Sequence, residues 1–227
     1  MTEELREEEP INPEGPGDEV EPELDAEARE RRRLALAQVV TFGDPVLKSP
    51  ATPVSEFDEE LAREVERMVG IMRDALGVGL AATQLGRMRR VLVFQAGPDA
   101  RPTALVNPEI EWVSEEHALA EEGCLSLPGV IVEVERPLHV RVSGRDASGA
   151  PLMIEGSGLE ARVIQHEIDH LDGVLILERT TREQRKGALR ALREGTTFSP
   201  DLLREPADAE PEAPDAETPA EAARAEA

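Results

Sequence analysis

The spacing of apolar positions changes along the chain, and each change predicts a different kind of element. Within residues 56–76 the apolar side chains recur every three or four positions, which is the period of an amphipathic helix. Ser55 and Asp58 stand at its start as a predicted N-terminal capping pair. Two glycines then end the helix and open a short extended stretch over residues 78–84.

Between residues 90 and 155, short β-rich segments alternate with Gly, Pro, Asn and Asp, a pattern typical of antiparallel strands joined by hairpins. The predicted strands are 91–94, 104–106, 130–132, 140–142 and 152–154. A helix is predicted over residues 158–171, a further strand over 174–177 and a last helix over 181–193. Strands flanked by helices, without strict alternation, predict an α+β fold.

The formal charge of −23 is concentrated at the two ends of the chain. Residues 1–33 contain 13 acidic and 5 basic side chains, and residues 198–227 contain 9 and 2. Both segments are rich in Glu, Pro and Ala, so they cannot bury enough apolar surface to offset the entropy of ordering. We therefore expect two disordered acidic tails and one folded domain over residues 34–197.

The composition also argues against several classes of protein. The single cysteine excludes an internal disulfide framework and gives no sign of an oxidising compartment. The N-terminus lacks the basic and apolar parts of a secretion signal. No run approaches the roughly 18 apolar residues that span a bilayer, and the acidic balance disfavours a nucleic-acid groove. We expect a cytoplasmic protein with no membrane or direct nucleic-acid function.

The segment His-Glu-Ile-Asp-His at 166–170 is the strongest chemical signal in the sequence. On a helix, His166 and His170 lie on one face about one turn apart, so they can bind a single metal ion. A catalytic tetrahedral site needs a third protein ligand as well as a position for water. Cys124 is the candidate because thiolate is the softest donor in the chain. A lone cysteine is more often a small buried hydrophobe, and the neighbouring histidine motif reverses that preference.

Glu167, between the two histidines, is the candidate general base. A dication bound by one thiolate and two neutral imidazoles keeps a local charge of about +1, so it acidifies a bound water less than three imidazoles would allow. A nearby carboxylate then becomes more necessary, and Glu167 is placed to accept the proton and pass it to a leaving group. Asp169 is either a hydrogen-bond partner of the site or a surface acid.

Residues 77–84 nominally match the GxGxxA pattern of dinucleotide-binding proteins. That fingerprint follows a strand and opens a helix, whereas here the glycines close a helix, so we disfavour the nucleotide interpretation. Small residues along an extended backbone better suit a wall for a substrate, with Gln84 offering an amide donor to an oxyanion. The alternative is a tight turn with Gln84 on the surface.

Three segments, Gly-Val-Gly-Leu-Ala-Ala-Thr-Gln at 77–84, Glu-Gly-Cys-Leu-Ser at 122–126 and His-Glu-Ile-Asp-His at 166–170, resemble the signature motifs of the peptide deformylases. All three match without a substitution, and the resemblance covers residues 41–194. It implies antiparallel β-sheets packed around a central helix that carries the HExxH motif, with a C-terminal helix. It also implies a hydrolase of protein biosynthesis that removes the N-formyl group from N-formylmethionine of newly made polypeptides.

By motif position, the resemblance implies that Cys124, His166 and His170 hold the metal and that Glu167 is the general base. Metal-bound water would attack the formyl carbon, and Glu167 would move its proton to the departing amine, releasing formate. Family members commonly use Fe²⁺, and Zn²⁺, Ni²⁺ or Co²⁺ can occupy the site. The ligand types alone leave several first-row metals open.

The resemblance also implies roles for groups that face the substrate. Gln84 and the backbone N–H of Leu125 would hold the oxyanion, and Gly79 would contact the substrate backbone. The methionine side chain needs an apolar pocket, and we expect Val78 and Val163 to help line it. Both valines are alternatively plain core residues, with the pocket favoured for Val78 and neither favoured for Val163.

The last predicted helix, residues 181–194, is a basic patch in an acidic protein. Its basic side chains are Arg182, Arg185, Lys186, Arg190 and Arg193. Some members of the resembled family dock on the ribosome through a C-terminal helix, which would make the ribosome a partner. A solvated helix face is the plainer interpretation.

Two rival functions remain open at this stage. A zinc endopeptidase shares HExxH, but no histidine follows His170, and Glu194 alone has a spacing that suits a third carboxylate ligand. The second rival is a non-enzymatic protein in which a metal only stabilises the fold or the acidic tails recruit partners. It would have a closed site of four protein ligands.

Overall fold

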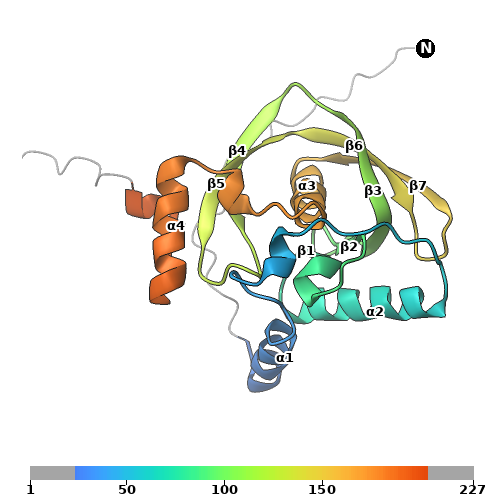
Figure 1. Cartoon of the computed structure of the whole chain (residues 1–227), viewed down its shortest axis with the longest axis horizontal. Helices are drawn as coiled ribbons and strands as arrows, with labels where there is room; N and C mark the ends of the chain where they lie inside the picture. The colour runs from blue at the N-terminus through green and yellow to red at the C-terminus, as the bar shows by residue number, and fades with distance from the viewer. Residues whose placement is uncertain (1–23, 204–227) are drawn as a thin grey trace, which may run out of the picture.

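The computed structural model describes residues 24–203, and Figure 1 shows their arrangement. The α-helices of these residues are α1 (Ala26–Leu36), α2 (Glu59–Asp74), α3 (Leu159–Leu171) and α4 (Arg182–Glu194). The strands are β1 (Gly79–Ala81), β2 (Val91–Phe94), β3 (Thr103–Val113), β4 (His117–Gly123), β5 (Ile131–Pro137), β6 (His139–Arg145) and β7 (Pro151–Ser157). Short 3-10 helices are η1 (Pro45–Lys48), η2 (Ala82–Leu85), η3 (Ile176–Glu178) and η4 (Pro200–Leu203).

Within residues 24–203 the strands form two antiparallel sheets. The larger sheet has the order β1-β2-β3-β6-β7, and β4 pairs with β5 in the second. Figure 1 shows α3 in the middle of the view, α2 below it and α4 on the outside beside β5. An α+β fold with antiparallel sheets is therefore confirmed.

Strand β2 separates two layers of the core. All four of its residues are buried, and successive side chains in a strand point to opposite faces. Val91 and Val93 pack in the cluster that contains the apolar face of α2, whereas Leu92 and Phe94 pack in the cluster that contains α3. The sheet is thus covered by a helix on each face, and α3 lies in the interior.

A third apolar cluster joins β5 to α4. It contains Val132 and Val134 from the inward face of β5, Ala188 from α4, and Phe198, which follows that helix. The ring of Phe198 lies so close to the helix that a Cβ on Gly187 would be 2.2 Å from it. Glycine is therefore required at residue 187, and this contact fixes the chain after α4.

The helix predicted over residues 56–76 is shorter at both ends. Asp58 alone caps α2, accepting a hydrogen bond from the backbone N–H of Leu61 at 2.9 Å, so the predicted role of Ser55 is wrong. Leu76, predicted on the apolar face, follows the helix with φ of 60° and is 51% exposed. The chain has turned out of the helix before it reaches this leucine.

The five predicted strands are each found, although most are longer than their apolar runs. Strand β4 was not predicted, since Leu119 is the one large apolar side chain among its seven residues. The strand predicted over residues 174–177 is wrong: this segment leads into η3, and its leucine and isoleucine side chains are buried beside α4. Four consecutive apolar residues do not distinguish a strand from a buried turn.

The predicted disordered tails extend too far into the chain. Residues 26–33, assigned to the first tail, belong to α1, and residues 198–203, assigned to the second, contain the buried Phe198 and η4. Residues 1–23 and 204–227, which make up the rest of both predictions, lie outside the described residues. Among the helices of residues 24–203, none has both the length and the apolar character needed to cross a bilayer.

Replacing Leu61 by Ala should lower the free energy of unfolding by about 2–5 kcal/mol, because this fully buried side chain leaves a cavity under α2. Leu76→Ala should change it by no more than about 0.5 kcal/mol, because that side chain is half exposed. Urea unfolding of the two variants measures the difference. Equal losses would contradict the helix boundary described above.

Candidate metal centre and active site

Helix α3 brings the two histidines of the HExxH segment together. His166 and His170 lie one turn apart, with ring centroids 5.0 Å apart and ring planes inclined at 69°. Cys124 follows the end of β4, and its Sγ lies 3.2 Å from Nε2 of His170. Among residues 24–203, these three side chains have ligand atoms that all lie within 4.8 Å of one another. The structure therefore brings together the three predicted metal ligands.

The donor set fits a first-row divalent cation. Bonds of about 2.0–2.3 Å in a tetrahedral site separate ligand atoms by roughly 3.3–3.8 Å, and the contact between Cys124 and His170 is close to that range. One thiolate with two imidazoles suits iron, zinc, nickel or cobalt. Three protein ligands match a catalytic site rather than a structural site, which has four.

Glu122 orients the first histidine. Its Oε2 lies 2.9 Å from Nδ1 of His166, so this ring nitrogen donates to the carboxylate and Nε2 remains for the metal. Burial raises the pKa of Glu122, but the hydrogen bonds with His166 and Arg136 outweigh it and lower the pKa to about 2. The carboxylate is therefore charged at neutral pH.

Two arginines hold this buried carboxylate. Arg136 binds both oxygens of Glu122, with Nε 2.6 Å from Oε1 and Nη2 2.9 Å from Oε2. Arg162 of α3 adds a contact of 2.7 Å to Oε1, and it also donates to the backbone oxygens of Ala118 and Val134. The side chain of Glu122 therefore ties β4, β5 and α3 together at the site.

Asp169 extends the same ion network. It accepts from Nη1 of Arg136 at 2.9 Å and from Arg179 at 2.5 and 3.0 Å, and the residue is only 8% exposed. Of the two interpretations left open by the sequence, the partner role fits and the surface acid does not. Arg136 was not predicted as part of the site, although an arginine at an inward position of the alternating strand β5 is a signal for a buried ion pair.

The two imidazoles have opposite electrostatic settings. Burial lowers the pKa of His166, but hydrogen bonds with Cys124 and Glu122 outweigh it and raise the pKa well above the ordinary value. Burial and the neighbouring His166 lower the pKa of His170. In addition, Nδ1 of His170 is buried without a hydrogen-bond partner among residues 24–203. Metal binding would require both rings in their neutral form.

Glu167 is buried at 4% exposure beside the metal ligands. Its Oε2 has no hydrogen-bond partner among the described residues, and burial raises its pKa to about 7. A cation between the three ligands would oppose this shift. Gly79 leaves room for the carboxylate, because a Cβ there would lie 2.3 Å from Oε1 and 2.9 Å from Cγ of Glu167.

Gln84 is buried and directed at the site, so the alternative of a surface Gln84 is wrong. The backbone N–H of Ala81 donates to its Oε1 at 2.9 Å, which fixes the orientation of the amide. Its Nε2 lies 3.3 Å from Oγ of Ser126 and 3.7 Å from Sγ of Cys124. The amide therefore presents its donor group on the side of the cysteine.

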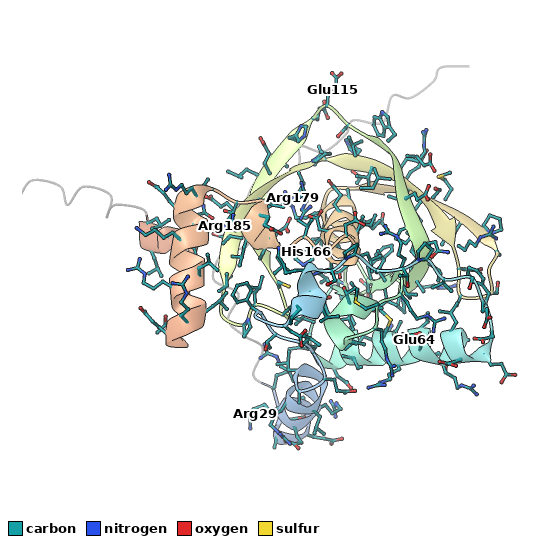
Figure 2. All side chains as sticks on the ribbon, viewed as in Figure 1. Arg29, Glu64, Glu115, His166, Arg179 and Arg185 are labelled. Atoms are coloured by element: carbon teal, nitrogen blue, oxygen red, sulfur yellow. The ribbon has the colours of Figure 1, made fainter. Side chains whose placement is uncertain are left out.

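A cleft of about 710 Å³ opens onto these groups. Val78, 46% exposed, and Val163, 5% exposed, both line it, as does Leu125. His166, Glu167 and Gln84 form part of the same wall. All the candidate site residues except His170 therefore line one cleft, and His170 lies buried behind Cys124. Figure 2 shows His166 near the middle of the molecule.

The geometry argues against the zinc endopeptidase and against the disfavoured dinucleotide interpretation. Glu194, which an endopeptidase would need, ends α4 on the surface and is not in the group of candidate ligands found within residues 24–203. The glycines of the GxGxxA match lead into β1 and a 3-10 helix of four residues, which has no extended helix N-terminus for a dinucleotide. His117 and His139 also lie outside the group of candidate ligands.

The sequence model that describes polypeptide deformylase matches residues 36–186. The chain belongs to this family. It is 47% identical to a peptide deformylase of Acidothermus cellulolyticus over 161 residues, which cover 71% of this chain and 88% of the relative. It is 45% identical to peptide deformylase 1 of Corynebacterium efficiens over 168 residues, covering 73% and 99%. This chain is accordingly an enzyme of the deformylase family.

Solved deformylase structures have the same fold. The Synechococcus elongatus enzyme, crystallised in complex with actinonin, superposes with a TM-score of 0.65 at 40% identity, covering 70% of this chain and 88% of the other. The Thermotoga maritima enzyme superposes with a TM-score of 0.61 at 45% identity, covering 63% and 96%. These two solved chains are thus covered over most of their length, whereas 30% or more of this chain lies outside each superposition.

In this deformylase family member, Glu122→Gln should weaken Zn²⁺ binding about 10- to 100-fold, because the neutral amide no longer fixes the orientation of His166. Glu121→Gln is the matched control, because this residue lines the same cleft but takes part in none of the contacts described above for Cys124, His166 and His170. Competition with a chromophoric chelator measures both affinities. Equal affinities for the two variants would show that the carboxylate does not act through the histidine.

Proposed function

We propose that this enzyme removes the formyl group from N-formylmethionine at the start of newly made polypeptides and releases formate. One observation carries the proposal: in a chain of the deformylase family, Cys124, His166 and His170 converge, and a cleft lined by Cys124, His166 and Glu167 can receive a peptide. The family membership supplies the reaction class, and the convergence supplies the groups that the reaction needs.

We assign Cys124, His166 and His170 as the ligands of one divalent cation per chain, Fe²⁺ by likeness to the family. When bound, such an ion supplies a Lewis acid that lowers the pKa of a water and stabilises negative charge on a carbonyl oxygen. The contact between Glu122 and His166 supports this assignment, because metal-binding histidines nearly always donate their second nitrogen to such a group.

Glu167 accepts a proton from the attacking water and returns it to the departing amine. The water oxygen bonds to the formyl carbon, the bond from that carbon to nitrogen breaks, and formate leaves with the water oxygen. A carboxylate without a competing hydrogen bond on Oε2 is suited to hold the proton between these two steps. Gly79 leaves the space in which this carboxylate lies beside the substrate backbone.

Gln84 and the backbone N–H of Leu125 donate to the oxygen that becomes negative as the water attacks. The fixed amide of Gln84 supports this role, since a donor held in place before the reaction needs no reorganisation during it. Val78 and Val163, on the wall of the same cleft, contact the methionine side chain. The partly exposed Val78 and the buried Val163 together provide an apolar surface on the cleft wall.

Glu167→Gln should lower formate release from formyl-Met-Ala-Ser by about 100-fold or more, because the amide cannot accept the proton. The protein is prepared anaerobically, and its metal content is measured alongside turnover. Glu160→Gln is the control, two turns earlier on the same helix and not part of the cleft wall. Wild-type turnover in a metal-loaded Glu167→Gln would remove the base from the mechanism.

A second proposal concerns α4 as a contact with the ribosome. The five basic side chains of this helix are all exposed, while Gln184, Gly187, Ala188 and Ala191 face the protein. In Figure 2, Arg185 lies on α4 at the left side of the molecule, away from His166. A basic helix face attracts a polyanionic surface such as ribosomal RNA, so we propose that it directs the enzyme to emerging chains.

Replacing Arg185, Lys186 and Arg190 together by Gln should weaken cosedimentation with ribosomes at low salt while leaving turnover of the tripeptide unchanged. The expected reason is the loss of three charges from the basic face of α4. A control of equal charge change replaces three other exposed arginines, namely Arg29, Arg33 and Arg63. Equal losses in both variants would point to net charge rather than to α4.

A further inference from the structure

The cleft of the proposed active site is bounded in part by residues that the family model does not match. Residues 36–186 match that model. Arg32 and Leu36 of α1 line the cleft on one side, and Ser199 and Leu202 line it after α4. Helix α1, except for its last residue, and the whole segment after α4 thus lie outside the matched region.

The wall formed by α1 is held firmly in place. Ala35 and Val39 are buried in the cluster that contains α2. Backbone hydrogen bonds join the chain after the helix to two segments of the site. The N–H of Val40 donates to the backbone oxygen of Gln84 at 2.7 Å, and the N–H of Phe42 donates to the backbone oxygen of Ser126 at 2.8 Å. These contacts fix α1 relative to the catalytic wall.

The wall formed by the segment after α4 is fixed in a similar way. Phe198 forms an isolated parallel bridge with Val130, in which the N–H of Phe198 donates to Gly129 at 2.9 Å and the N–H of Ile131 donates to Phe198 at 2.8 Å. The buried ring of Phe198 anchors the segment against Gly187. Leu202, four residues later, lies on the cleft and is 66% exposed.

Exposed apolar side chains gather along this cleft. Of the thirteen large apolar side chains that are exposed within residues 24–203, five line it. They are Leu76, Val78, Ile131, Leu159 and Leu202. Such a gathering marks a binding surface rather than ordinary scattered exposure. Pockets of roughly 300–1,000 Å³ bury most of a drug-sized ligand, so a cleft of about 710 Å³ holds more than one formylmethionyl residue.

We propose that α1 and the segment Thr197–Leu202 form two outer walls of the peptide-binding cleft and favour substrates with apolar side chains downstream of the formylmethionine. This inference rests on the proposed function, because the walls continue the same cleft that contains Glu167 and His166. The catalytic groups then act on the formyl amide, and the two outer walls, which apart from Leu36 lie outside the matched region, select the chain that follows it.

The test compares two substrates, formyl-Met-Ala-Leu-Leu-Ser and formyl-Met-Ala-Ser-Ser-Ser, by their kcat/KM ratio. The wild-type enzyme should prefer the leucine peptide by about threefold to tenfold, the effect of burying one or two small apolar groups. Leu202→Ser should lower this ratio toward one, while Leu203→Ser, exposed but not on the cleft, should leave it at the wild-type value. Leu36→Ala and the exposed Leu34→Ala form a second pair for α1, with melting temperatures recorded for all four variants.

Equal turnover of the two pentapeptides by the wild type would overturn the inference. So would an unchanged ratio in both Leu202→Ser and Leu36→Ala, or an equal fall in the Leu203→Ser and Leu34→Ala controls. Turnover of formyl-Met-Ala separates this result from the function itself. A metal-loaded wild type that releases no formate from that dipeptide contradicts the proposed function, whereas one that cleaves it and ignores the pentapeptide sequence contradicts the outer walls alone.

Discussion

The site depends on one buried carboxylate. Glu122 of β4 contacts Arg136 of β5 and both Arg162 and His166 of α3. A buried charge is stable only when it is paired, and removing one partner of such a network costs about 3–5 kcal/mol. Because every partner of Glu122 is polar and directional, the network sets the relative position of β4, β5 and α3. Apolar packing alone would not specify that position so narrowly.

The same carboxylate explains why the proposed ligands can meet although they are far apart in the sequence. Cys124 lies two residues after Glu122, and His166 binds Glu122 directly, so fixing the carboxylate also fixes the cysteine relative to the histidine. His170 follows from the helical period of α3, which packs beneath β2 and β7. Asp169, on the same helix, joins the network through Arg136. The position of the candidate ligands is thus determined by the backbone between Glu122 and Cys124, by the helical spacing of His166 and His170, and by the ion network that joins these two segments.

The sequence revealed those parts of the protein in which a local period or a short motif carries the information. The four-residue spacing of His166 and His170 and the apolar period of α2 are of this kind, and the structure has both features. Strand β4 and residues 174–177 were missed because their structure is decided by partners distant in the chain. The contacts of Arg136 were missed for the same reason. Helix α1 was missed because arginines and glutamates dominate it and its one buried residue, Ala35, creates no helical period.

In the proposed mechanism, the residues that perform the chemistry are separate from those that meet the rest of the substrate. Glu122, Arg136 and Asp169 are all buried, so a change in any of them disturbs both folding and the geometry of the candidate ligands. Leu202 is largely exposed and is held by the backbone bonds and anchoring ring of Phe198, so its side chain can change while the wall keeps its position. The proposed selectivity can therefore vary at a residue such as Leu202 at little cost in stability, because substitutions at exposed positions outside an ion network rarely change it by more than about 0.5 kcal/mol. Variation in this protein should accordingly concentrate on the proposed outer walls of the cleft, with the ion network and the three candidate donors kept intact.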